Sequence, residues 1–76
     1  MLKAIEFAKY ILNNKHIAET TDSYTLKRDT EKCVHRSEKE LKFYCHSKGL
    51  NYNKVMSKAQ TELAQEEMKM AFIRLP

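Results

Sequence analysis

The scarcity of glycine and proline constrains this chain more than any other feature. A single glycine, Gly49, and a single proline, Pro76, occur in 76 residues. Because these two residues mark most sharp turns, the chain has few places to reverse its direction. Its apolar content of 42% is ordinary for a folded protein. We therefore expect a few long helices, arranged as one all-α, three-helix domain that spans residues 1–76.

The first helix is predicted from Leu2 to about Asn14. Asn13 and Asn14 suit a helix end, because asparagine tolerates left-handed backbone conformations. Apolar side chains recur here at the three- and four-residue spacing of one helix face, namely Ala4, Ile5, Ala8, Ile11 and Leu12. This face is expected to enter the core.

Residues 16–28 allow two interpretations. Thr20–Ser23 has the composition of a turn. Ile17 on one side of it and Tyr24–Leu26 on the other could be the strands of a short β-hairpin. The same residues could instead form an ordered loop between the first two helices. The sequence leaves both open.

The second helix is expected to begin at Asp29 or Thr30, either of which can cap it. It should end at Lys48, because Gly49 follows in the manner of a helix C-terminus. Asn51 or Asn53 then caps a third helix that runs to about Arg74. Since the connection is short, these two helices are expected to form a hairpin.

The second helix has two opposed faces. At about 100° per residue, one side gathers the core candidates Val34, Leu41, Tyr44 and Cys45. The other side is a concentrated positive stripe with one aromatic ring in it. We take this stripe as the candidate partner-binding surface, which comprises Lys32, His35, Arg36, Lys39, Lys42, Phe43 and His46.

Three interpretations of this stripe remain open. In the first interpretation, the stripe is a solvated helix face, with Glu38 and Glu40 paired to basic neighbours and Phe43 half-buried under the preceding loop. It binds an acidic protein, or it binds nucleic acid through phosphate contacts and stacking. The net charge of +4 is compatible with either ligand. A DNA-binding helix-turn-helix fits poorly, because the basic residues precede the turn instead of following it.

The third helix carries a heptad seam that one charged residue, Glu66, interrupts. The seam consists of Tyr52, Met56, Ala59, Leu63, Glu66, Met70 and Ile73. It packs on the first two helices, or part of it pairs with a second copy of the chain. A short first helix leaves the far end uncovered, so we expect a homodimer. The expected self-association residues are Met70, Phe72, Ile73 and Leu75, unless the first helix folds back over them.

No motif for catalysis or metal binding is present. The sequence lacks a glycine-rich phosphate loop, a nucleophile motif, a Cys-x-x-Cys pair and a His-Glu-x-x-His pair. Cys33 and His35 lie two residues apart and would project in different directions from a helix. We expect no enzyme activity, no cofactor and no metal, with Cys33 and Cys45 as small buried side chains.

These observations predict a small non-enzymatic regulatory or adaptor protein. It binds an acidic protein partner through the basic stripe, with nucleic-acid binding as the alternative. No run approaches the ~18 apolar residues of a membrane span, and charged residues interrupt the apolar N-terminal stretch, so we expect a cytoplasmic protein. The small size and the abundance of lysine and asparagine are typical of phage or mobile-element products.

Overall fold

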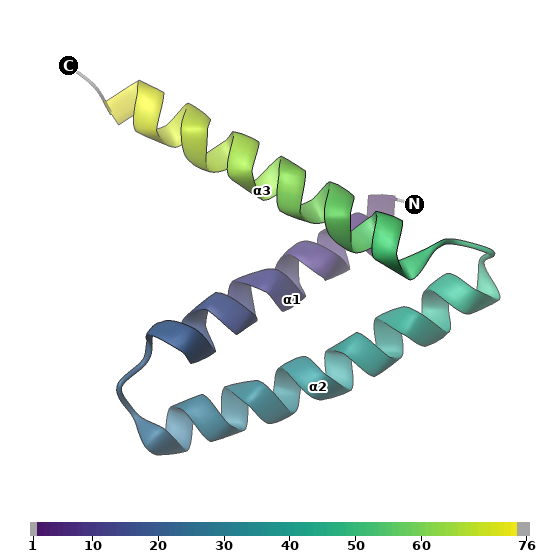
Figure 1. Ribbon diagram of the computed structural model, residues 1–76, viewed down its shortest axis with the longest axis horizontal. Helices are drawn as coiled ribbons and strands as arrows, with labels where there is room; N and C mark the ends of the chain where they lie inside the picture. Colours follow the sequence, from purple (N-terminus) through teal and green to yellow (C-terminus); the bar gives the residue numbers. More distant parts are fainter. Residues whose placement is uncertain (1, 75–76) are drawn as a thin grey trace.

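The computed structural model describes the backbone of residues 2–74 and the side chains of residues 2–69. It consists of three helices, α1 (Leu2–Thr20), α2 (Tyr24–Ser47) and α3 (Tyr52–Arg74), with no strand in these residues. In Figure 1, α1 and α2 lie side by side and antiparallel, and α3 crosses the N-terminal part of α1 before it diverges. The predicted all-α fold is therefore confirmed. No helix among the described residues is both long and apolar enough to cross a membrane.

The stretch 16–28 is neither a β-hairpin nor a long loop, which corrects both interpretations of the sequence. α1 continues through it to Thr20, and only residues 21–23 separate the two helices. Asn14 does not stop α1, because its side-chain amide donates to the Tyr10 carbonyl 2.9 Å away within the helix. Thr20 likewise donates its hydroxyl to the His16 carbonyl at 2.8 Å. Polar residues that favour turns are therefore accommodated inside the helix here.

The second helix begins about a turn and a half earlier than the sequence indicates. Ser23 is its N-cap, and the Ser23 hydroxyl accepts a hydrogen bond from the Leu26 backbone N–H at 3.2 Å. Asp29 and Thr30, the predicted caps, both lie inside α2. Three residues of similar capping ability stand in this stretch, and local composition alone does not rank them.

The turn between α2 and α3 follows the prediction closely. Gly49 has a φ of 68°, a conformation that only glycine adopts without strain. The Leu50 N–H donates to the Cys45 carbonyl at 2.8 Å, which closes a Schellman-type end on α2. Asn51 caps α3, because its side-chain oxygen accepts from the Lys54 N–H at 3.2 Å.

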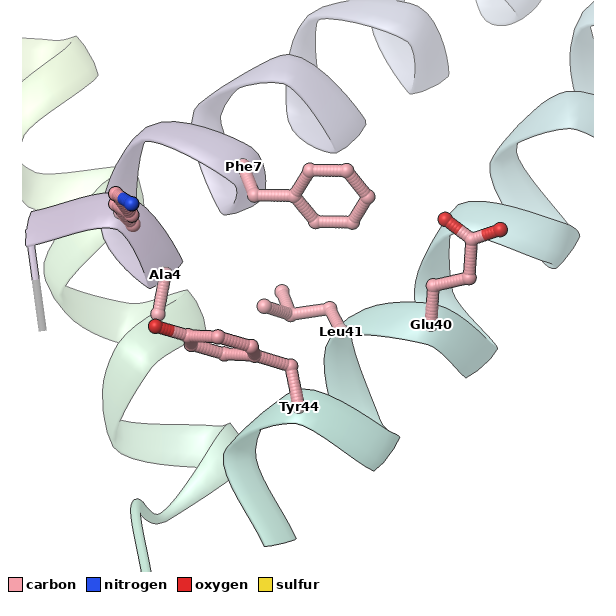
Figure 2. A pocket seen from close by; sticks show the side chains of 6 residues that line it. Ala4, Phe7, Glu40, Leu41 and Tyr44 are labelled. Atoms are coloured by element: carbon pink, nitrogen blue, oxygen red, sulfur yellow. The ribbon is translucent and has the colours of Figure 1, made fainter. Parts of the chain in front are cut away.

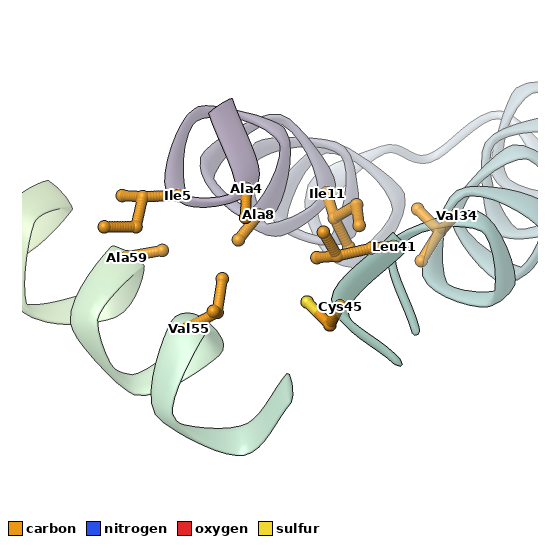
Figure 3. Close-up of a cluster of buried hydrophobic side chains, with 9 residues drawn as sticks. All are labelled: Ala4, Ile5, Ala8, Ile11, Val34, Leu41, Cys45, Val55 and Ala59. Atoms are coloured by element: carbon orange, nitrogen blue, oxygen red, sulfur yellow. The ribbon is translucent and has the colours of Figure 1, made fainter. Parts of the chain in front are cut away.

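The core is organised around α1, which packs on both other helices. Figure 3 shows Ile11 of α1 beside Leu41 of α2, and Ile5 of α1 facing Ala59 of α3. The small side chains of Ala4 and Ala8 are fully buried and let the neighbouring helices approach closely. The remaining buried members of this cluster are Val34, Cys45 and Val55.

The predicted hairpin of α2 and α3 is not confirmed as a closely packed pair. The two helices contact one another only sparsely, whereas each of them packs extensively on α1. Figure 1 shows them splayed apart from their short connection. A short connection therefore fixes which helix ends are neighbours, but not how far the helices stay together.

The heptad seam of α3 is only partly internal. Ala59 is buried, and Tyr52, Met56 and Leu63 are half-buried. Val55, which is as fully buried as Ala59, lies beside the predicted seam. From Ala64 to Lys69 every described residue is exposed. The first half of α3 thus belongs to the core, and the helix then leaves it.

Glu66, the charge that interrupts the seam, binds a lysine of α1. The Lys9 ammonium donates to a Glu66 carboxylate oxygen at 2.9 Å and lies 3.7 Å from a Glu62 carboxylate oxygen. This hydrogen bond to Glu66 raises the pKa of Lys9, and both carboxylates add to the effect. The contact marks the last point at which a described side chain of α3 is tied to α1.

Shortening a side chain at the centre of this core should lower stability. Ile11 is fully buried, so Ile11→Val is expected to reduce the free energy of unfolding by about 0.5–1.5 kcal/mol. Ile17 lies on the same helix with 39% of its surface exposed. Ile17→Val should therefore change the free energy of unfolding by less than about 0.5 kcal/mol. Urea unfolding followed by circular dichroism compares the two. Equal effects would contradict the position of the core.

Candidate functional site

The outer face of α2 carries all seven residues of the predicted partner-binding surface, and every one of them is exposed. These are Lys32, His35, Arg36, Lys39, Lys42, Phe43 and His46. They follow one side of the helix over about 21 Å, at 1.5 Å per residue. The opposite side of α2 buries Val34, Leu41 and Cys45 against α1 and α3 and half-buries Tyr44. The two-faced character of this helix is therefore present in the structure, whereas the binding role of the outer face stays a prediction.

Phe43 is the most informative side chain of this face. It is 79% exposed, the largest exposed fraction among the large apolar side chains described. The alternative that a preceding loop covers Phe43 is wrong, because the stretch expected to form that loop is helical. An aromatic ring in water between Lys39 and His46 contributes little to folding.

Glu38 and Glu40 of α2 do not neutralise the outer face as expected. Glu38 turns away from it, with a carboxylate oxygen 3.5 Å from the Lys15 ammonium of α1. The same oxygen accepts a hydrogen bond from the Tyr52 hydroxyl of α3 at 3.4 Å. Glu40 makes no ion pair with any described residue. The pairing of Glu38 and Glu40 with basic neighbours on their own helix is therefore not observed.

Lys42 differs from the other cations of the face. Its ammonium lies 5.2 Å from the centre of the Tyr52 ring, so it stabilises the junction of α2 and α3 through a cation–π contact. Burial, reinforced by the nearby Glu38 carboxylate, raises the pKa of the Tyr52 phenol, which remains a hydrogen-bond donor. Lys42 is thus partly occupied within the fold. Lys32, Arg36 and Lys39 make no ion pair with a described residue and are available for a ligand.

The sequence interpretation missed one member of this face, Arg28. Because α2 begins at Tyr24, Arg28 lies one helical turn before Lys32 on the same side. Its guanidinium lies 6.0 Å from the Tyr24 ring centre, and its Nε is 3.8 Å from an Asp29 carboxylate oxygen. The spacing of residues 28, 32, 35 and 39 is that of one helix face and would have revealed Arg28 as a member. A helix that starts at Asp29 excludes Arg28.

The two cysteines have different environments. Cys45 is buried in the core, as predicted, but Cys33 is exposed, which is a correction. The Cys33 sulfur lies 3.9 Å from the Tyr10 hydroxyl, at the outer edge of the α1–α2 contact. Cys33 falls outside the buried face of α2 because it precedes Val34 by one residue, a rotation of about 100°. Within the described residues no three His, Cys, Asp or Glu side chains gather into a metal-binding group.

The predicted self-association residues lie outside the described side chains. Met70, Phe72 and Ile73 belong to the part of α3 of which only the backbone is described, and Leu75 lies beyond it. Their role stays a prediction.

No family model, curated protein or solved structure matches this chain.

If Phe43 serves a ligand and not the core, its removal should leave the fold intact. Phe43→Ala is expected to change the free energy of unfolding by less than about 0.5 kcal/mol. Leu41→Ala, two residues away but only 1% exposed, should cost about 2–5 kcal/mol. Chemical unfolding of both variants provides the comparison. A large loss for Phe43→Ala would assign this ring to the core.

Proposed function

We propose that this protein is a small non-enzymatic regulator or adaptor that binds an acidic protein partner through the outer face of α2. One observation carries the proposal, namely the 79% exposed ring of Phe43 on the same face as Lys32, Arg36 and Lys39, which make no ion pair with a described residue. Aromatic side chains and arginine are enriched in the residues that supply most of the binding energy at protein interfaces. Phe43 is the anchor in this proposal, and Arg36 and Lys39 select an acidic surface around it.

The chemistry of the face favours a protein over a polyanion. Nucleic-acid binding draws its affinity from many cations that meet a continuous row of phosphates. Here three exposed acids, Asp29, Glu31 and Glu40, border the cations on the same helix. A uniform line of phosphates would meet repulsion at each of them, whereas a protein surface can offer a complementary charge. Nucleic acid therefore remains the second candidate.

Reversing the central cations should abolish partner capture. The triple variant Lys32→Glu, Arg36→Glu, Lys39→Glu and the single variant Phe43→Ala are both expected to lose a partner that the wild type recovers. A matched control replaces Lys27, Lys54 and Lys58 with Glu, because these lysines are exposed elsewhere and give the same change in net charge. Pull-downs compare the four proteins after circular dichroism has verified their folding. Equal recovery by all four would reject this face.

The salt dependence of binding separates the two ligand classes. For a nucleic acid, each phosphate contact changes the slope of log affinity against log salt by roughly −0.7 to −0.9. Anisotropy titrations with single-stranded and duplex oligonucleotides at low salt measure this directly. Tight binding with a steep slope that the triple variant loses would favour the nucleic-acid function over the protein partner.

We further propose that the chain forms a homodimer through its C-terminal apolar residues, Met70, Phe72, Ile73 and Leu75. The exposed course of α3 from Ala64 to Lys69 supports this, because the helix has already left the core when the apolar residues begin.

A charge within this C-terminal segment should dissociate the dimer. Ile73→Glu is expected to shift the protein from dimer to monomer in sedimentation equilibrium at micromolar concentrations. Leu2→Glu is the control, because Leu2 is 77% exposed at the start of α1 and should leave association unchanged. A wild type that stays monomeric throughout this range would contradict the proposal.

A further inference from the structure

A hollow of about 280 Å³ opens between the first turns of α1 and the C-terminal half of α2. Figure 2 shows Ala4, Phe7, Leu41 and Tyr44 around it, with the Glu40 carboxylate at its edge. Lys3 is the remaining lining residue. The volume lies just below the usual range for small-molecule sites and suits a few apolar side chains.

The apolar surface continues along α1 beyond the hollow. The Phe7 and Tyr10 rings are stacked, with centres 6.2 Å apart and planes inclined by 29°. Tyr10 is 51% exposed, and its hydroxyl lies beside Cys33 of α2. Together these side chains form an apolar strip along one seam of the α1–α2 pair, with Glu40 as the acidic residue that lines the hollow.

The chain's own α3 does not reach this hollow. Ile5 and Lys9, which meet α3, lie on a different side of α1 from Phe7, about 160° away at 100° per residue. α3 remains helical through Arg74, so its last described turn lies about 12 Å beyond Glu66, which is tied to Lys9. Figure 1 shows α3 pointing away from α1 and α2 at that end. Only another molecule can bring a C-terminal segment here.

The C-terminal sequence is chemically complementary to the hollow. Residues 70–76 read Met-Ala-Phe-Ile-Arg-Leu-Pro, with Arg74 as their single charge. The hollow is apolar and has one charged residue from each helix, Lys3 of α1 and Glu40 of α2. An apolar segment with one cation complements the apolar walls and the Glu40 side of this hollow. We propose that the hollow receives residues 72–75 of a second copy, with Arg74 of that copy beside Glu40, and that the exchange is reciprocal. This inference rests on the homodimer proposed above and identifies its receptor site.

Two copies that each place a C-terminal segment in the hollow of the other form a closed two-fold dimer. Each copy offers one hollow and one C-terminal segment, so the interface is self-complementary and leaves neither exposed. The outer face of α2 takes no part in this exchange and stays available to a different partner.

Charge reversal tests the docking directly. Glu40→Arg and Arg74→Glu should each weaken dimerisation roughly threefold to tenfold, because every dimer holds the contact twice. Combining both substitutions in one chain should restore the wild-type dissociation constant. Glu31→Arg is the control, since Glu31 is an exposed acid on another side of α2 and should have little effect. Sedimentation equilibrium gives the constants for all four variants.

Nuclear magnetic resonance locates the receptor site independently. A ¹⁵N-labelled Ile73→Glu chain retains its hollow, and unlabelled wild type added to it should shift the amide signals of Phe7 and Tyr44. The amide of Gln60, exposed on α3, should stay in place.

These shifts together with rescue by the double variant support the docking. If Ile73→Glu abolishes the dimer while Glu40→Arg leaves its affinity unchanged, the C-terminal segments pair with one another and the hollow is not their receptor. A wild type that is monomeric at every concentration overturns the docking and the homodimer together.

Discussion

The packing of α1 against both other helices is the contact on which the whole structure depends. α2 and α3 touch one another only sparsely, so without α1 neither would have an apolar surface to pack against. Ala4 and Ala8 make this arrangement possible, because side chains this small let two helices approach α1 closely along its N-terminal half. The ion pairs Lys9–Glu66 and Lys15–Glu38 then connect α1 to α3 and to α2 at the edges of the core.

An arrangement with one central helix leaves much surface uncovered. The molecule measures 46 × 32 × 15 Å, which is little more than one layer of helices in its shortest dimension. α2 therefore exposes its full outer face, and α3 leaves the core about halfway along its length. A thin domain of this kind offers two long helix surfaces among its described residues. The proposed binding by surface contact uses one of these surfaces, the outer face of α2.

The charged residues divide into those that hold the fold and those that remain available. Lys9, Lys15 and Lys42 contact carboxylates or an aromatic ring of another helix. Lys32, Arg36 and Lys39 contact no described acid and precede the exposed ring of Phe43 on the same helix face. Two of the cations that the fold uses lie on α1, whereas α2 carries Lys42 together with the three that make no such contact. Net charge alone does not distinguish the two groups.

The sequence by itself determined the helical class, the two faces of α2 and the turn at Gly49, because each depends on local periodicity or on a single backbone conformation. It did not place the start of α2, since Ser23, Asp29 and Thr30 are all competent caps and the structure uses Ser23. It placed both cysteines in the core, whereas Cys33 is exposed, because it lies about 100° around the helix from the buried Val34. Tertiary structure alone decided that Glu38 bridges all three helices, that Phe43 stays in water, and that α3 diverges from α2 after a short turn. These features depend on which helix faces meet across long sequence separations, and no local pattern of residues specifies that.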